Sequence, residues 1–175
     1  MMKLTISKAI EVLQQTPKTL HAFLYNLSDD WIFCDEGSET WNAYDIVGHL
    51  IHGEKTDWMQ RLDIILKQGD NNTFEPFDRF AQFENSKGKS LHNLLGEFSE
   101  LRSQNLEQLK ALNITESQFS LKAIHPELGE VTLGQLLATW VTHDLGHIAQ
   151  IARVMAKQYK QDVGPWEAYI SILHK

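Results

Sequence analysis

Residues 140–150 read WVTHDLGHIAQ, and within this stretch two histidines stand four residues apart. On an α-helix a step of four residues turns about 400° and rises about 6 Å, so His143 and His147 share one face and can reach one metal ion. Apolar residues continue this face at steps of three and four, which predicts a long helix with the pair turned inward. They are Leu136, Trp140, Ile151 and Val154.

The spacing of this pair fits two interpretations. The imidazoles could be core side chains that hydrogen-bond to a neighbouring hydroxyl or carbonyl group, since a buried imidazole needs a polar partner. They could equally be ligands of a metal ion. The glutamate of the HExxH zinc-protease motif is missing, because Asp144 follows His143 and points about 100° away from it. A zinc protease is therefore not indicated.

A third histidine holds a comparable place on another expected helix. His49 lies in IVGHLIHGE, residues 46–54, well inside a helix expected over 42–68. Gly53 follows one turn later on the same face, where glycine costs about 1 kcal/mol relative to alanine. It either leaves room beside a ligand or allows close helix packing. Three neutral imidazoles, His49 and the pair above, would hold a divalent ion and leave a coordination position open.

Other polar residues near these histidines are weaker candidates. His52 lies about 300° from His49 and is an alternative third ligand, although we expect it to face a neighbouring helix or solvent. Three side chains could accept the unused ring N–H groups: Asp45, Asp144 and Gln150. For Asp45 helix capping is the stronger expectation, and for Asp144 solvent exposure. The remaining histidines lack a partner at ligand spacing and are expected at the surface: His21, His92, His125 and His174.

Helical periodicity extends along almost the whole chain, with little strand signal. We expect a first helix broken at Thr16-Pro17, then helices over 42–68, 90–112 and 132–159, and a short closing helix over 166–174. The connection 69–88 contains four phenylalanines among turn-forming residues, which suggests a wall or lid. The pattern predicts an all-α four-helix bundle, with a long connection between the second and third helices, in one domain over residues 1–175.

Composition limits the classes of partner. The chain is 42% hydrophobic and 22% charged, which is typical of a protein with a buried core. Its net charge of -7 argues against nucleic acid. We expect no membrane partner and a cytoplasmic location, because no stretch approaches the roughly 20 apolar residues of a bilayer span and the amino terminus lacks signal-peptide features. The single cysteine, Cys34, is expected to be a small buried residue rather than a nucleophile.

Three segments, taken in their order and separation, resemble the DinB-like superfamily of metal-binding four-helix bundles, which includes bacillithiol S-transferases. They are Trp41-Asn42 with IVGHL at 46–50, Trp58-x-x-Arg61-Leu62, and HDLGHIAQI at 143–151. The resemblance implies that His49, His143 and His147 ligate a divalent ion, commonly nickel or zinc. It also implies a homodimer.

Family members of known activity use the metal to activate a low-molecular-weight thiol. The resemblance thus implies a thiol S-transferase that conjugates such a thiol to a small electrophile. Cationic groups that could hold an acidic thiol are Arg61, Arg79, Arg102 and Arg153. Two alternatives stay open: a metal-dependent hydrolase, and a non-catalytic dimeric metal-binding module. Hydrolysis would need a carboxylate base, for which Glu54 and Asp57 are candidates unless they lie on a solvated helix face.

Overall fold

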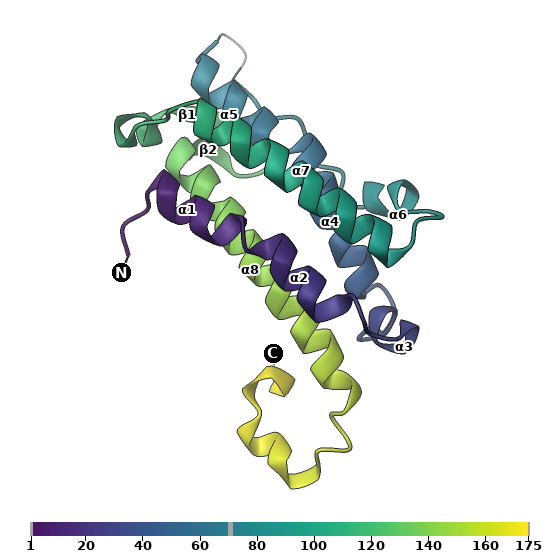
Figure 1. Cartoon of the computed structure of the whole chain (residues 1–175). Coiled ribbons are helices and arrows are strands. Elements are labelled where there is room, and N and C mark those ends of the chain that lie inside the picture. The colour runs from purple at the N-terminus through teal and green to yellow at the C-terminus, as the bar shows by residue number, and fades with distance from the viewer. Residues whose placement is uncertain (1, 70–71, 175) are drawn as a thin grey trace.

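Four helical rods form the body of the molecule in the computed structural model, which describes residues 2–69 and 72–174 (Figure 1). Two rods each consist of two consecutive helices. The rods are α1 (Ile6–Leu13) with α2 (Thr16–Leu24), α4 (Ala43–Thr56) with α5 (Trp58–Lys67), α7 (Leu91–Ala111), and α8 (Leu133–Gln158). The predicted all-α four-helix bundle is confirmed.

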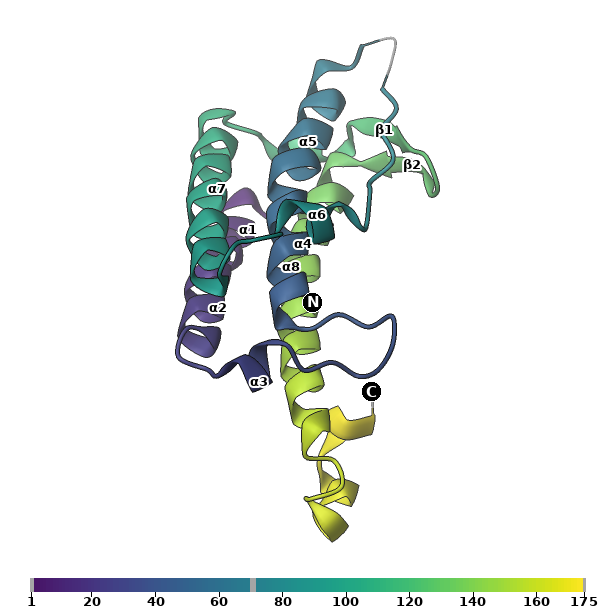
Figure 2. The same cartoon turned by 90° about the vertical axis from the view of Figure 1, so that its right-hand side faces the viewer.

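The direction of the rods follows from the long connection between α5 and α7. Figures 1 and 2 show α4–α5 and α7 running the same way along the bundle, while α1–α2 and α8 run the opposite way. The connection returns along the bundle and includes the short helix α6 (Ala81–Asn85). Every helix in the described ranges is too short or too polar to cross a bilayer.

Three of the long helices begin with the same reciprocal cap. The side chain of the N-cap residue accepts the backbone N–H of the third helical residue, and the side chain of that residue accepts the backbone N–H of the N-cap residue. The pairs are Asn42 with Asp45, Ser90 with Asn93, and Thr132 with Gln135. These caps confirm the predicted starts of α4 and α8. They also confirm the capping role of Asp45.

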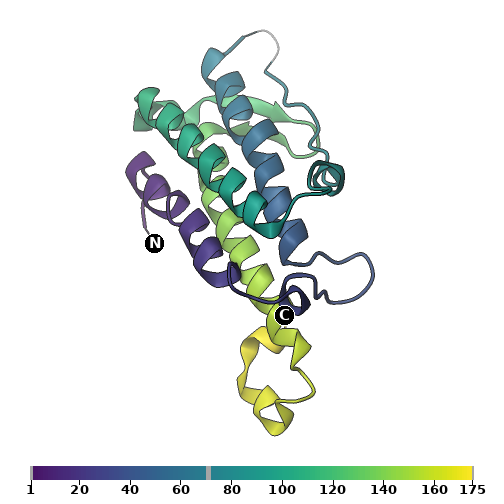
Figure 3. The ribbon, with the colours of Figure 1, turned by 45° about the vertical axis from the view of Figure 1, so that its right-hand side comes forward.

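The structure corrects several element boundaries. The helix expected over 42–68 breaks at Asp57, where φ is -119° and ψ is -71°, and continues as α5. A hairpin that the periodicity did not predict pairs β1 (Lys122–His125) with β2 (Gly129–Thr132), and its turn ends at Gly129 with a φ of +73° that favours glycine. The closing segment is not an α-helix. It consists of two 3₁₀ turns, η2 (Gly164–Tyr169) and η3 (Ser171–His174), which project beyond the bundle (Figure 3).

Two further short elements complete the chain: α3 (Asp29–Ile32) and the 3₁₀ turn η1 (Glu116–Ser120). Cys34 follows α3 and is half-buried against the core, where its thiol donates to the carbonyl oxygen of Trp31 at 3.3 Å. The interpretation of Cys34 as a small packed residue is supported, although its burial is incomplete.

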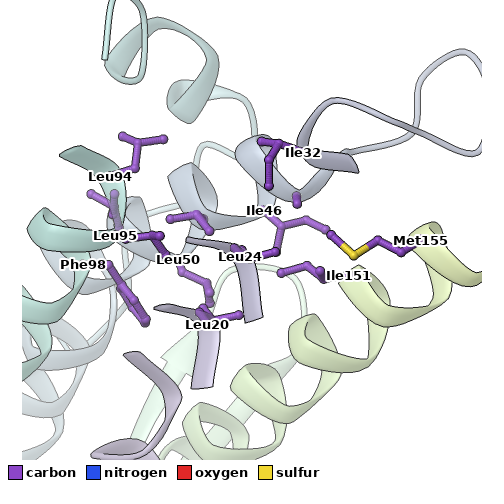
Figure 4. Packing of buried hydrophobic residues seen from close by; sticks show 13 residues of the cluster. Leu20, Leu24, Ile32, Ile46, Leu50, Leu94, Leu95, Phe98, Ile151 and Met155 are labelled. Atoms are coloured by element: carbon purple, nitrogen blue, oxygen red, sulfur yellow. The ribbon is translucent and has the colours of Figure 1, made fainter. Parts of the chain in front are cut away.

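The core consists of two clusters stacked along the bundle axis. One joins α2, α4, the first half of α7 and the far end of α8, and it includes Leu24, Ile46, Phe98 and Ile151 (Figure 4). The other gathers α5, the second half of α7 and the beginning of α8 around Trp58. The bundle therefore has a boundary between the clusters midway along α7.

At that boundary lies Arg102, whose side chain is 1% exposed. Its guanidinium donates to both carboxylate oxygens of Asp144, at 2.6 and 3.0 Å, and to Glu54 at 2.8 Å. It also donates to the carbonyl oxygen of Leu13 at 2.8 Å, and Trp140 Nε1 donates to Glu54 at 3.1 Å. One side chain thus ties α7 to α1, α4 and α8.

Replacing Arg102 by leucine should lower the free energy of unfolding by about 3–5 kcal/mol, because Glu54 and Asp144 would stay buried without their cation. Urea denaturation followed by circular dichroism measures this loss. Lys110→Leu on the exposed side of the same helix is the control and should change stability by less than about 1 kcal/mol. A small effect of Arg102→Leu would show that the buried ion network is not needed for the fold.

Candidate metal centre

The three histidines singled out by spacing meet at one point between α4 and α8. His143 Nε2 lies 3.1 Å from His49 Nε2 and 3.1 Å from His147 Nε2. All three nitrogens lie within 4.8 Å of one another, and within the described part of the chain no carboxylate or thiol joins this cluster. We call these three residues the histidine triad.

The geometry of the triad fits a metal ion better than a purely structural core. Two imidazoles bound to one tetrahedral ion at about 2.0–2.1 Å have their ligand nitrogens about 3.3 Å apart, close to the observed separations. Without a metal ion, His143 Nε2 would have to hydrogen-bond to both other histidines while carrying at most one proton. The Nδ1 atoms of His49 and His143 are buried without a hydrogen-bond partner among the described residues, with or without an ion at the Nε2 atoms.

Burial keeps these imidazoles uncharged. It lowers the pKa of His49 to about 3, with the neighbouring His147 as a further cause, and the pKa of His143 to about 3 for the same reasons. The pKa of His147 is also lowered, mainly by burial. Neutral imidazole is the form that ligates a metal, so the site is ready at neutral pH without losing protons.

One of the three side chains expected to accept an unused ring N–H does so. Gln150 Oε1 lies 2.9 Å from His147 Nδ1 and accepts its N–H, which leaves the Nε2 lone pair directed at the centre. The other two candidates serve elsewhere: Asp45 caps α4, and Asp144 binds Arg102. The expectation that Asp144 is solvated is wrong, because its side chain is fully buried.

The triad forms part of the wall of a cavity of about 400 Å³. This volume suits a small organic molecule. The cavity lies between α4–α5 and α8 and is also lined by residues 74–79 of the connection after α5 and by the β1–β2 hairpin. Trp41, Phe77 and Trp58 surround the imidazoles, with ring centroids 4.9 Å from His49, 5.5 Å from His49 and 5.2 Å from His143, respectively. The phenylalanine-rich connection thus forms a wall of the site, as predicted.

Gly53 serves both roles that its position allowed. It lines the cavity one turn after His49, and a side chain there would place its Cβ 3.2 Å from the indole nitrogen of Trp58. Such an approach is tighter than most Cβ contacts, so glycine permits both the open volume and the packing of Trp58.

The candidate bases and cations divide between the cavity and the core. Asp57, Arg61 and Arg79 line the cavity, whereas Glu54 and Arg102 lie in the buried network and cannot touch a ligand. Arg153 is bound to Glu36 at 2.6 Å and lines a separate hollow.

His52 does not join the triad, although it is buried. It packs against Phe77 with ring centroids 4.9 Å apart. His125 was expected at the surface, but it is half-buried and lines the cavity from the hairpin. Its contribution depends on the hairpin pairing, which helical periodicity cannot reveal.

The lowered histidine pKa values predict a pH dependence of the metal-free protein. Unfolded histidines take up protons below about pH 6.5, whereas folded His49 and His143 stay neutral down to about pH 3. The free energy of unfolding of the metal-free protein should therefore be highest above pH 6.5 and should fall as the pH is lowered toward 3. Urea denaturation of chelator-treated protein at pH 8, 6 and 5 measures this loss.

The variant His143→Phe separates this effect from the titration of carboxylates. It should lose less stability than the parent chain between pH 8 and pH 5. Equal losses in the two proteins would contradict a triad that is held neutral by burial.

Comparison with known proteins places this architecture in a family. The model of the DinB superfamily matches residues 13–151. The solved structure of YfiT from Bacillus subtilis, described as a probable metal-dependent hydrolase with an unusual four-helix bundle topology, is similar with a TM-score of 0.75 and 22% identity over 90% of each chain. At this identity the likeness concerns the fold. A search of curated proteins gave no match. The family model covers most of the chain and includes all three histidines, and we conclude that the chain belongs to the DinB superfamily.

Proposed function

We propose that this protein is a divalent-metal-dependent S-transferase that joins a low-molecular-weight thiol to a small electrophile. The observation that carries the proposal is the histidine triad in the wall of a cavity, without a fourth ligand from the described residues. An open coordination position distinguishes reactive metal sites from structural ones. Nickel and zinc both suit three imidazole nitrogens.

The residues around the triad have separate tasks. A divalent cation held there would supply a Lewis acid that lowers the pKa of a thiol. Gln150 orients His147, and the aromatic rings of Trp41, Trp58 and Phe77 exclude water from the imidazoles. In the overall reaction the proton of the thiol passes to solvent, its sulfur forms a bond to carbon, and the leaving group departs with the electron pair of its broken bond to that carbon.

The position of the acidic groups favours thiol transfer over hydrolysis. Hydrolysis needs a base beside the attacking water, usually within hydrogen-bond reach. Glu54 is committed to Arg102, and Asp57 lies eight residues after His49, a helical rise of about 12 Å. A thiol whose pKa the cation has lowered needs no such base, so the described residues suit this chemistry better.

Metal-dependent hydrolysis is the second candidate because one observation favours it. Asp57 lines the same cavity, and burial raises its pKa to about 6, near the range of a general base at neutral pH. YfiT, which shares the fold, is described as a probable metal-dependent hydrolase. A ligand that draws the α4–α5 junction toward the triad would bring Asp57 into use.

Replacement of His147 by alanine should abolish stoichiometric zinc or nickel binding and thiol-dependent conjugation, while the helical circular dichroism spectrum is retained because packing stabilises the bundle. Elemental analysis and conjugation of cysteine or glutathione to 1-chloro-2,4-dinitrobenzene provide the two readouts. The exposed histidine variant His92→Ala is the matched control and should keep both properties.

The same assays separate the alternatives. Turnover of 4-nitrophenyl acetate without any thiol would favour the hydrolase. Metal binding without turnover of either substrate would favour a non-catalytic metal-binding module. Absence of bound metal in protein purified without chelator would contradict all three.

A further inference from the structure

The cavity extends well beyond the triad and has a second polar end. Its lining residues run along α8 from His147 back to Gln135, and along α4–α5 from His49 to Arg61. Each run covers thirteen residues, and its twelve steps correspond to a helical rise of about 18 Å. A ligand that touches the triad can therefore reach other groups far from it.

Arg61 is the cationic side chain at the end of the cavity away from the triad. Its Nε lies 2.6 Å from Asp57 Oδ1, and its guanidinium carbon lies 5.0 Å from the centre of the Phe74 ring. The two charged side chains are 12% and 10% exposed, so this guanidinium is held in place inside the cavity wall. A guanidinium carries five N–H donors, more than one carboxylate can take up. Arg61 can thus bind a second anionic group.

His125 adds a donor at the same end. Its Nδ1 accepts the backbone N–H groups of Glu127 at 3.1 Å and Leu128 at 3.2 Å, which places the ring proton on Nε2. Burial and the charge of Arg61 lower the pKa of His125, so its ring is neutral in this tautomer. The ring also contacts Phe74 edge to face, with centroids 6.2 Å apart. Phe74 thus touches both Arg61 and His125.

The other charged residues in the cavity leave this arrangement intact. Asp57 is the carboxylate that fixes Arg61, and Glu127 is exposed at the hairpin turn. Arg79 lies toward the triad, since its charge contributes to lowering the pKa of His49. Between the two ends the wall is mostly apolar, with Trp58, Phe77 and Leu136, and Thr139 adds one hydroxyl group.

We infer that Arg61 and His125 form a carboxylate-binding subsite for an elongated, largely apolar acid whose reacting atom lies at the histidine triad. This inference deepens the proposed function and rests on it for the reaction, although binding at the subsite itself needs no metal. The substrate class is therefore a small molecule with one carboxylate, separated by an apolar segment from the reacting group.

Isothermal titration calorimetry with 4-phenylbutanoate and its neutral analogue 4-phenylbutanamide tests the subsite. The full chain should bind the acid at least about tenfold more tightly than the amide, as expected for a charge-assisted hydrogen bond. This preference should appear in both metal-free and zinc-loaded protein. Arg61→Gln should abolish it, and His125→Gln should reduce it severalfold.

Two further variants guard against indirect effects. Arg61→Gln leaves Asp57 without its cation, so the double variant Asp57→Asn with Arg61→Gln removes both charges and should also lose the preference. Lys110→Gln makes the same change of charge on an exposed part of α7 and should retain it.

Any of these results would overturn the subsite: absence of binding, equal affinity for acid and amide, or a preference that survives both Arg61 variants. A preference seen only with zinc would place the carboxylate at the ion, which also overturns the subsite but leaves the metal centre intact. Failure of the thiol-transfer assay would not change these binding results, so the two proposals fail separately.

Discussion

The buried guanidinium of Arg102 is the interaction on which the arrangement of the helices depends. It binds a carboxylate on α4, a carboxylate on α8 and a backbone carbonyl of α1. Its partner on α8 is adjacent in sequence to the ligand His143, and Glu54 follows His49 on α4. Since both acids are in the core, rotation of either helix would separate them from Arg102. The network that joins the two core clusters therefore also sets the faces that α4 and α8 turn toward the triad.

Aromatic packing connects this network to the cavity. Trp140 donates to Glu54 and stacks on Trp58 with ring planes 9° apart. Trp58 in turn contacts His143 edge to face and occupies the space beside Gly53. The histidines thus pack on one side against buried groups of the core. On their other side lies the cavity, which is bounded by the connection after α5 and by the hairpin. This division suits a site in which the metal ligands are held by the core and the substrate binds against the connection and the hairpin.

Local sequence patterns predicted the helices and the shared face of His143 and His147, because periodicity and caps act over a few residues. That His49 joins this pair was implied by the resemblance to the DinB-like superfamily, since it lies 94 residues from His143 in the sequence. The break at Asp57 and the hairpin were missed, because helical periodicity continues through residue 57 and gives no signal for two short strands. The hairpin also depends on a distant segment, since the backbone N–H of Phe74 donates to Ile124 and ties the connection to β1. Arg102 and Asp144 look like surface residues in the sequence, and only the packing of four rods shows that they meet. His125 was missed for the same reason. Long-range pairing, rather than local propensity, decides these positions.

The central claim is that three imidazoles hold one divalent ion with a position left for a ligand. X-ray absorption spectroscopy of the zinc-loaded protein, before and after addition of a small thiol, measures the coordination directly. The account predicts imidazole scattering from three histidines at about 2.0–2.1 Å, and a new sulfur neighbour at about 2.3 Å once thiol is added. A first shell with fewer histidines, or one closed by a fourth protein ligand that the thiol cannot displace, would contradict it.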